Sequence, residues 1–184
     1  NKPYSAFTSY PINDPGIWET NLEEGKVQYH HILNDENYPY EYTKTIKFTE
    51  GRPEMVISYL LKNKGKQTIE TEVFNHNFFV FDDQLIGEGC ELTFTTNISC
   101  SGENSGLGDI AEIEDNKLKI LRSLGKGESV YCDSIIAINN DAIDYDIQID
   151  NHKAGVGVQI KGNRPISNLV FWCRGKTICP EPYI

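Results

Sequence analysis

Long hydrophobic runs are missing from this sequence. Apolar runs such as residues 78–81 and 135–138 extend over four residues, whereas a helix that crosses a bilayer needs roughly 20. The sequence therefore excludes a transmembrane helix. The chain begins at Asn1, with neither a Met nor a charged and then apolar leader, so we expect a processed or trimmed product.

Positive charge is also scarce. The chain has 17 Lys and Arg residues against 27 Asp and Glu residues, for a formal net charge of −10. Nucleic acids and anionic membrane surfaces are bound through dense basic patches, so neither is expected as a partner. Disorder is excluded as well, because 39% hydrophobic and 11% aromatic residues can build a core at this length. We predict a single domain over residues 1–184.

Cysteine is too rare for a disulfide scaffold. The five cysteines form no Cys-x-x-Cys pair, and their odd number leaves at least one thiol free. Cys90 and Cys100 could pair across a loop, and the alternative is five small, mostly buried thiols. The cysteine content favours the cytoplasm and leaves the periplasm open.

Helical periodicity is nearly absent, and two-residue alternation of apolar and polar side chains takes its place. This alternation is typical of strands with one buried face. It predicts an all-β fold, a large antiparallel β-sandwich of two packed sheets. The predicted strands are residues 27–33, 38–48, 55–61, 68–74, 91–96, 117–121, 129–138, 145–149, 155–161 and 168–173. Residues 99–108 are predicted to be an exposed loop, and residues 1–20 an irregular segment whose Trp18 docks on the core.

One polar group among aromatic residues stands out. His76 lies between Asn75 and Asn77, with Phe74 and Phe78 beyond them. Polar groups placed among apolar neighbours need hydrogen-bond partners or a function. His76 is thus a hydrogen-bonded structural residue or a catalytic or binding residue.

A second candidate lies near the end of the chain. Glu181 stands between Pro180 and Pro182, and the two prolines predict a stiff segment outside the strand ladders. An acid held beside Trp172 and Tyr183 suits a sugar, because aromatic faces pack on the apolar face of a pyranose. The alternative is a surface glutamate in a proline turn.

These segments resemble the galactose mutarotase-like superfamily, the aldose 1-epimerases and their relatives. Residues 71–79, Thr-Glu-Val-Phe-Asn-His-Asn-Phe-Phe, are similar to the family's Asn-His-x-Tyr/Phe-Phe segment. Residues 155–160, Pro165 and residues 169–172 look like the strand, proline and strand that lead to the family's catalytic loop. Glu181 then falls where the family places its catalytic glutamate. The resemblance extends over residues 38–184.

The resemblance implies both a fold and an activity. The fold is the family's supersandwich, and because family members are much longer we expect this chain to be part of such a domain, incomplete at both termini. The activity is interconversion of the anomers of a small aldose, in which His76 acts as general acid and Glu181 as general base. No metal or organic cofactor is expected. The expected substrate-binding residues are Asn75, Asn77, Trp172, Arg174 and Tyr183.

Two other functions stay open. A non-catalytic carbohydrate-binding sandwich would keep the aromatic residues without turnover. A polysaccharide lyase or glycosidase is less well supported, because hydrolysis usually needs two carboxylates and only Glu181 has a suitable setting.

Two other sites are considered and rejected. Cys179 has no histidine nearby in the sequence, which argues against a cysteine nucleophile. His30 and His31 are adjacent on a strand and point to opposite faces, so they cannot bind one metal together.

Overall fold

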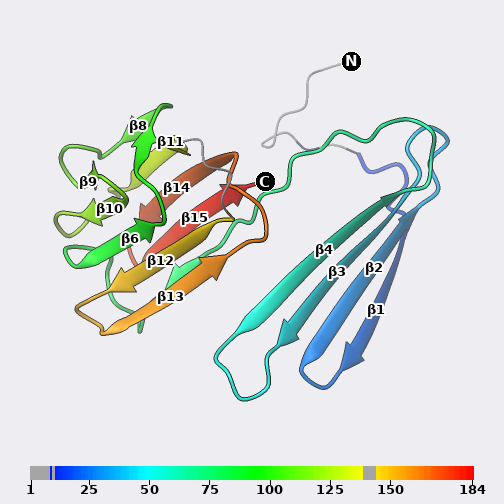
Figure 1. Ribbon diagram of the computed structural model, residues 1–184, viewed down its shortest axis with the longest axis horizontal. Helices are drawn as coiled ribbons and strands as arrows, with labels where there is room; N and C mark the ends of the chain where they lie inside the picture. The colour runs from blue at the N-terminus through cyan, green and yellow to red at the C-terminus, as the bar shows by residue number, and fades with distance from the viewer. Residues whose placement is uncertain (1–8, 10, 139–143) are drawn as a thin grey trace. The chain divides into compact units, whose positions relative to one another are not determined.

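The chain folds into β-strands joined by turns and loops (Figure 1). The computed structural model describes residues 9, 11–138 and 144–184, and every regular element within these ranges is a strand. An all-β fold with antiparallel sheets was predicted and is confirmed. Within the same ranges, no helix has the length and hydropathy needed to cross a membrane.

The chain contacts define two compact units, Asn1–Thr71 and Glu72–Ile184, where the sequence predicts one domain. The first unit holds a four-stranded antiparallel meander in the order β1-β2-β3-β4. Its strands are β1 (Ile17–Glu23), β2 (Lys26–Leu33), β3 (Tyr40–Phe48) and β4 (Met55–Asn63).

The second unit is the sandwich. One of its sheets has the order β13-β12-β6-β10-β9, and the other has the order β5-β15-β14-β11-β7, with β8 paired to β11. The strands of the first sheet are β6 (Cys90–Phe94), β9 (Ala111–Glu114), β10 (Lys117–Ile120), β12 (Asp146–Asn151) and β13 (Val156–Lys161). Those of the second are β5 (Phe79–Val80), β7 (Ile98–Cys100), β8 (Asn104–Ser105), β11 (Val130–Ala137), β14 (Asn168–Arg174) and β15 (Thr177–Tyr183).

The core of the second unit is formed by alternate side chains of both sheets. Along β14 the odd-numbered residues Leu169, Phe171 and Cys173 are buried in this core. Leu118 and Ile147 contribute from the facing sheet. The even-numbered residues of β14 therefore point to the opposite, outer face of their sheet, because successive side chains of a strand alternate.

Several predicted elements differ from the observed ones. Residues 68–74 form no strand and make only an isolated bridge at Phe74, so the meander ends at β4. The segment predicted to be irregular contains β1, and Trp18 lies on it with 58% of its surface exposed, stacked on the ring of His31. Residues 99–108 contain the end of β7 and all of β8, because β11 offers its edge to both.

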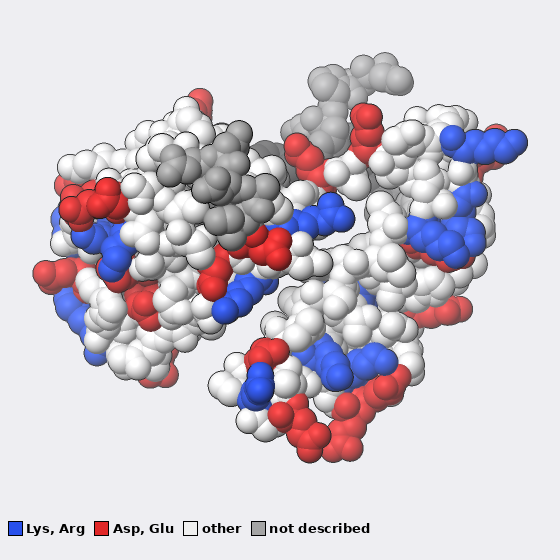
Figure 2. Space-filling view, viewed as in Figure 1, with Lys and Arg blue, Asp and Glu red and all other residues white. Residues whose placement is uncertain are grey.

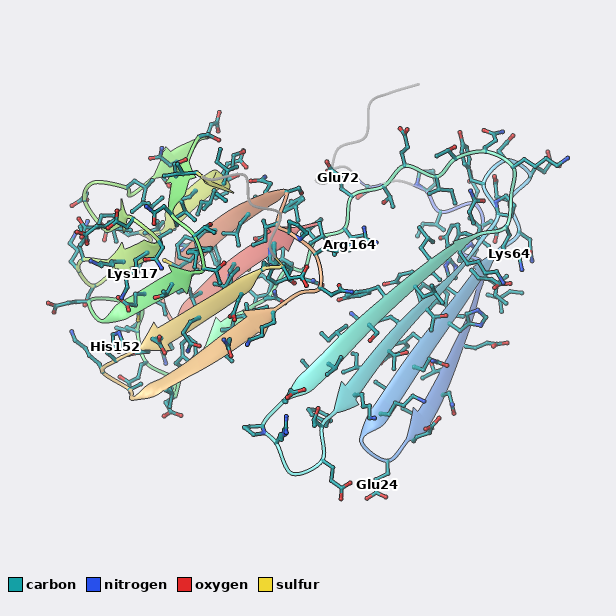
Figure 3. All side chains as sticks on the ribbon, in the orientation of Figure 1. Glu24, Lys64, Glu72, Lys117, His152 and Arg164 are labelled. Atoms are coloured by element: carbon teal, nitrogen blue, oxygen red, sulfur yellow. The ribbon has the colours of Figure 1, made fainter. Side chains whose placement is uncertain are left out.

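All five cysteines are free thiols, so the pairing considered for Cys90 and Cys100 is absent. Basic and acidic side chains form small mixed groups on the visible face (Figure 2). One such group lies on the five-stranded sheet, where Lys117 and His152 are labelled in Figure 3. Both contact Oε1 of Glu91, at 2.8 Å and 3.3 Å. These contacts, led by the hydrogen bond from Lys117, lower the pKa of Glu91.

Candidate functional site

The β14–β15 hairpin places Glu181 on the outer face of its sheet. The two strands are antiparallel, with Val170 opposite Glu181 and Trp172 opposite Cys179. Side chains directly opposite each other in a ladder share a face, so Cys179 and Glu181 lie on the same side as Trp172. Gly175 closes the hairpin with a φ of +59°, a conformation that glycine adopts without steric cost.

Glu181 lies in a regular strand, and not in the segment outside the ladders that the two prolines predict. The reason is the direction in which Pro180 and Pro182 face. Their carbonyls point away from β14, since the Pro182 oxygen accepts from the Asn75 amide at 3.3 Å and the Pro180 oxygen from Asn77 Nδ2 at 3.5 Å. The missing N–H groups therefore lie on an edge without a continuous ladder, where proline is tolerated in a strand.

The segment that carries His76 runs along this same edge. It is fixed at one end by the bridge between Phe74 and Tyr183, whose rings stack with centroids 4.7 Å apart. At the other end, β5 pairs with β15 through Phe79 and Ile178. Between these two anchors His76 is held over β15, beside Cys179 and Glu181.

His76, Cys179 and Glu181 form a compact cluster. Nε2 of His76 lies 3.4 Å from Oε1 of Glu181, and Nδ1 lies 3.1 Å from Sγ of Cys179. Sγ in turn lies 3.6 Å from the same carboxylate oxygen. The side chain of Glu181 is 10% exposed and that of His76 is 47% exposed, so the imidazole covers the carboxylate on the side of the solvent.

The cysteine in this cluster is a poor nucleophile. Burial, and after it the charge of Glu181, raise the pKa of the Cys179 thiol to about 12. Because the thiolate is the reactive form of cysteine, a histidine 3.1 Å away does not suffice to activate it. No histidine is near Cys179 in the sequence, but the fold brings His76 to it, and the raised pKa of the thiol still argues against a cysteine nucleophile.

Aromatic rings border the cluster. Phe78 packs against His76 with ring centroids 4.3 Å apart and meets Trp172 edge to face at 6.3 Å. Tyr183, two residues from Glu181 on the same face of β15, stacks on Phe74. The site thus combines a buried acid with half-exposed aromatic surface, an arrangement that can hold a ligand with both polar and apolar faces.

The other predicted substrate-binding residues have different surroundings. Asn75 and Asn77 hold the His76 segment to β15 through the two proline carbonyls. Arg174 is exposed and lies opposite Thr177 at the hairpin end. Thr177 is four positions before Glu181 on β15, about 13 Å along the strand. The structure therefore brings His76, Trp172 and Tyr183 together with Glu181, and leaves Arg174 apart.

Two residues of this face were not among the predicted site residues. Cys179 was considered only as a nucleophile. Tyr131 on β11 lies opposite Trp172 and therefore shares its face. Burial raises the pKa of Tyr131, and the carboxylates of Asp133, Glu103 and Glu181 add to this effect. Alternation along residues 129–138 indicates which residues share a face of the strand with Tyr131. Only the pairing of β11 with β14 places Tyr131 beside Trp172.

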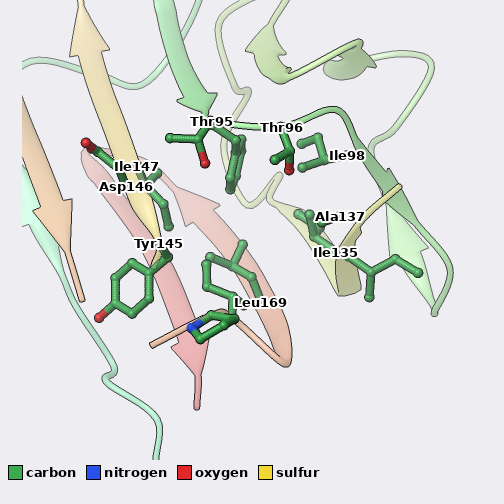
Figure 4. Close-up of a pocket in the computed structure, with 13 residues that line it drawn as sticks. Thr95, Thr96, Ile98, Ile135, Ala137, Tyr145, Asp146, Ile147 and Leu169 are labelled. Atoms are coloured by element: carbon green, nitrogen blue, oxygen red, sulfur yellow. The ribbon is translucent and has the colours of Figure 1, made fainter. Parts of the chain in front are cut away.

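A cavity elsewhere in the second unit does not belong to this cluster. It lies at one end of the sandwich, between the two sheets (Figure 4). Its walls are mostly apolar, with Ile98, Ile135, Ile147 and Leu169 among the residues that line it. His76, Cys179 and Glu181 are not part of its lining as far as the described residues show.

Comparisons of the chain with protein-family models, with curated proteins and with solved structures find no match in any of the three. The function of the cluster has to be inferred from its own geometry.

Proposed function

We propose that this protein is a mutarotase-like isomerase that interconverts the anomers of a small aldose. The observation that carries the proposal is the 3.4 Å distance between Nε2 of His76 and Oε1 of Glu181. One proton donor and one proton acceptor side by side are what anomer exchange requires, because one proton must reach the ring oxygen while another leaves the C1 hydroxyl.

The contacts around the imidazole support the role of His76 as the acid. Sγ of Cys179 can donate its single proton either to Nδ1 or to Glu181. If it donates to Glu181, Nδ1 must carry a proton to donate to the sulfur. Nε2 must carry a proton to donate to the carboxylate. With Glu181 ionised, all three contacts are hydrogen bonds at once when the imidazole carries both protons, and this is the form that can give one away.

The reaction balances with these two groups alone. His76 gives a proton to the ring oxygen, and Glu181 removes the proton of the C1 hydroxyl. The bond between C1 and the ring oxygen breaks, which leaves an open-chain aldehyde and a hydroxyl at the former ring oxygen. After rotation about the C1–C2 bond the ring closes on the other face of the aldehyde. Glu181 then returns its proton to the C1 oxygen, and His76 takes one back from the former ring oxygen.

The surroundings support a sugar as the substrate. Phe78 and Trp172 meet edge to face next to the imidazole, and a pyranose presents an apolar C–H face to such rings. Because His76 is the more exposed member of the pair, a sugar enters from its side. The free thiols favour a cytoplasmic location, which stays a prediction.

Magnetisation-exchange NMR on the anomers of glucose and galactose tests this proposal. The folded protein should accelerate anomer exchange over buffer, and His76→Ala or Glu181→Gln should each lower that rate by roughly 10²- to 10⁴-fold. Glu88→Gln is the matched control, because Glu88 is exposed and pairs only with Lys153 in the described ion pairs. Exchange no faster than in buffer would reject the isomerase.

The aromatic residues also favour a second function, a carbohydrate-binding module without turnover. The stacked pair of Phe74 and Tyr183 and the pair of Phe78 and Trp172 would provide the binding surface. In that case sugar binding survives Glu181→Gln and no anomer exchange accompanies it. Isothermal titration of glucose and galactose into the wild-type protein and into Glu181→Gln measures sugar binding, and this measurement together with the exchange rates distinguishes the two functions.

A further inference from the structure

We propose that His76, Cys179 and Glu181 also form a binding site for a soft divalent cation of the zinc type, and that such a cation shuts off the acid–base pair. The regulatory half of this inference rests on the proposed function, whereas cation binding does not. The three side chains offer a nitrogen, a sulfur and an oxygen ligand atom, all within 4.8 Å of one another. In the part of the chain that the structure describes, no other group of three His, Cys, Asp or Glu residues meets this condition.

The distances fit a tetrahedral ion. Zinc binds sulfur at about 2.3 Å and nitrogen or oxygen at about 2.0–2.2 Å, so two ligand atoms on one tetrahedral ion lie roughly 3.3–3.6 Å apart. Sγ of Cys179 and Oε1 of Glu181 are 3.6 Å apart, and Oε1 and Nε2 of His76 are 3.4 Å apart. The nitrogen nearer to Sγ is Nδ1, at 3.1 Å, so the imidazole has to rotate for one nitrogen to bind the ion together with Sγ and Oε1.

The types of ligand decide which cation fits. Thiolate and imidazole together suit zinc and its neighbours among the transition metals. Calcium and magnesium prefer sites built from oxygen alone, and this cluster supplies one carboxylate. Three protein ligands leave the fourth tetrahedral position open to water or to a sugar hydroxyl.

The backbone holds two of the ligands in place before any ion binds. Cys179 and Glu181 are buried on the same face of one strand, and their positions are fixed by the ladder with β14. His76 is half exposed and can move aside to admit an ion. On binding, the ion displaces the thiol proton and the protons shared among the three side chains. One ring nitrogen of His76 and one carboxylate oxygen of Glu181 are then bound to the ion, so these two atoms can no longer give or take a proton.

Cobalt provides a direct spectroscopic test on the 184-residue chain. Co²⁺ bound through a thiolate gives a sulfur-to-metal charge-transfer band in the near ultraviolet, and this band should appear with one equivalent of Co²⁺ and disappear when Zn²⁺ is added. Cys179→Ser should abolish the band. Loss of a supporting group outside the ligands already costs about 10–100-fold in metal affinity, so loss of the ligand in His76→Ala should weaken binding at least as much.

Cys100→Ser is the matched control, because this half-buried thiol contacts the carbonyls of Gly102 and Asp133 instead. It should keep the band. X-ray absorption of the Zn²⁺-loaded wild-type protein avoids any dependence on variant folding. It should find one sulfur at about 2.3 Å and lighter ligands at about 2.0–2.2 Å. Absence of a sulfur ligand, or a band that survives in Cys179→Ser, would overturn the site.

Anomer exchange measured with and without Zn²⁺ separates the two proposals. If both proposals hold, Zn²⁺ slows anomer exchange in the wild-type protein in proportion to the fraction of His76–Cys179–Glu181 sites that it occupies. A thiolate band without anomer exchange supports the metal site and rejects the isomerase. Anomer exchange without any thiolate band rejects the metal site and leaves the isomerase standing. Exchange that is unaffected at full Zn²⁺ occupancy overturns the regulatory half.

Discussion

Nε2 of His76 lies 3.4 Å from Oε1 of Glu181, although the two residues belong to segments far apart in the sequence. They are brought together because the segment before β5 runs along the edge of β15 that faces away from β14, and Glu181 lies on β15. Under the proposed function the two side chains act together in one step, and mutagenesis can test this.

The effects of removing these two groups should not add. If His76 and Glu181 act in one proton-transfer step, the double variant His76→Ala/Glu181→Gln should be no slower in anomer exchange than the slower single variant. The three rates from magnetisation-exchange NMR give this comparison directly. Rate losses that multiply in the double variant would mean that the two residues act independently.

Trp172 should report sugar binding. The chain has two tryptophans, Trp18 and Trp172, and Trp18→Phe leaves Trp172 as the single emitter. Titration with sugar should then change the fluorescence of this variant, because Trp172 lies next to the ring of Phe78 at the site. The matched variant Trp172→Phe keeps only Trp18, on β1. A response that follows Trp18 would place the sugar elsewhere.

Acid should weaken the second unit through Glu128. Hydrogen bonds from Arg122, and then from the Gly125 amide, lower the pKa of Glu128 to about 2 from its ordinary 4.5. A carboxyl whose pKa is lower in the folded state stabilises the fold fully above its unfolded pKa. That contribution is lost as the pH falls from 4.5 towards 2. The carboxylate is exposed, so the effect is small and is screened by salt.

Urea unfolding at low ionic strength, at about pH 6 and about pH 3, measures this loss. Glu128→Gln should flatten the difference between the two midpoints. Lys153→Met is the control, since it breaks an exposed pair with Glu88 and leaves the Arg122 group intact. Equal pH dependence in wild type and Glu128→Gln would contradict the assignment.

The core beneath the site should be sensitive to truncation. Leu169 is 1% exposed and lies opposite Pro182 in the β14–β15 ladder. Leu169→Ala should lower the free energy of unfolding of the second unit by about 2–5 kcal/mol, from lost burial and the cavity left behind. Leu85 is 62% exposed, and Leu85→Ala should change the free energy of unfolding by less than about 0.5 kcal/mol. Chemical denaturation followed by Trp172 fluorescence compares the two, and similar losses would mean that Leu169 is not part of the core.

Alternation of side chains was enough to predict most of the strands. The segments predicted at 27–33, 117–121, 155–161 and 168–173 are observed within one residue at either end as β2, β10, β13 and β14. In β10 and β14 every second side chain is buried, which is the pattern that alternation indicates. Residues 68–74 were predicted as a strand because a turn signal precedes them, yet they lack a partner strand and pair only at Phe74. Local pattern cannot supply the partner that a strand requires.

The prolines around Glu181 were misread for a related reason. Proline is excluded from a strand only where the ladder needs its N–H, and which edge of a strand faces a neighbour is a tertiary property. The edge of β15 on which Pro180 and Pro182 lack N–H groups faces the His76 segment, and their carbonyls accept hydrogen bonds from that segment. The identity of both candidate residues was predicted from the sequence, but the strand that holds Glu181 was not.

The sequence by itself determined the class of the fold and the two residues that carry the candidate chemistry. Period-two alternation dictates strands, and a histidine or a glutamate among aromatics and prolines is conspicuous in one dimension. Only the tertiary structure decided that Cys179 joins His76 and Glu181 and that Arg174 stays apart. Strand register and edge exposure arise from pairing between distant segments, and pairing fixes which side chains share a face.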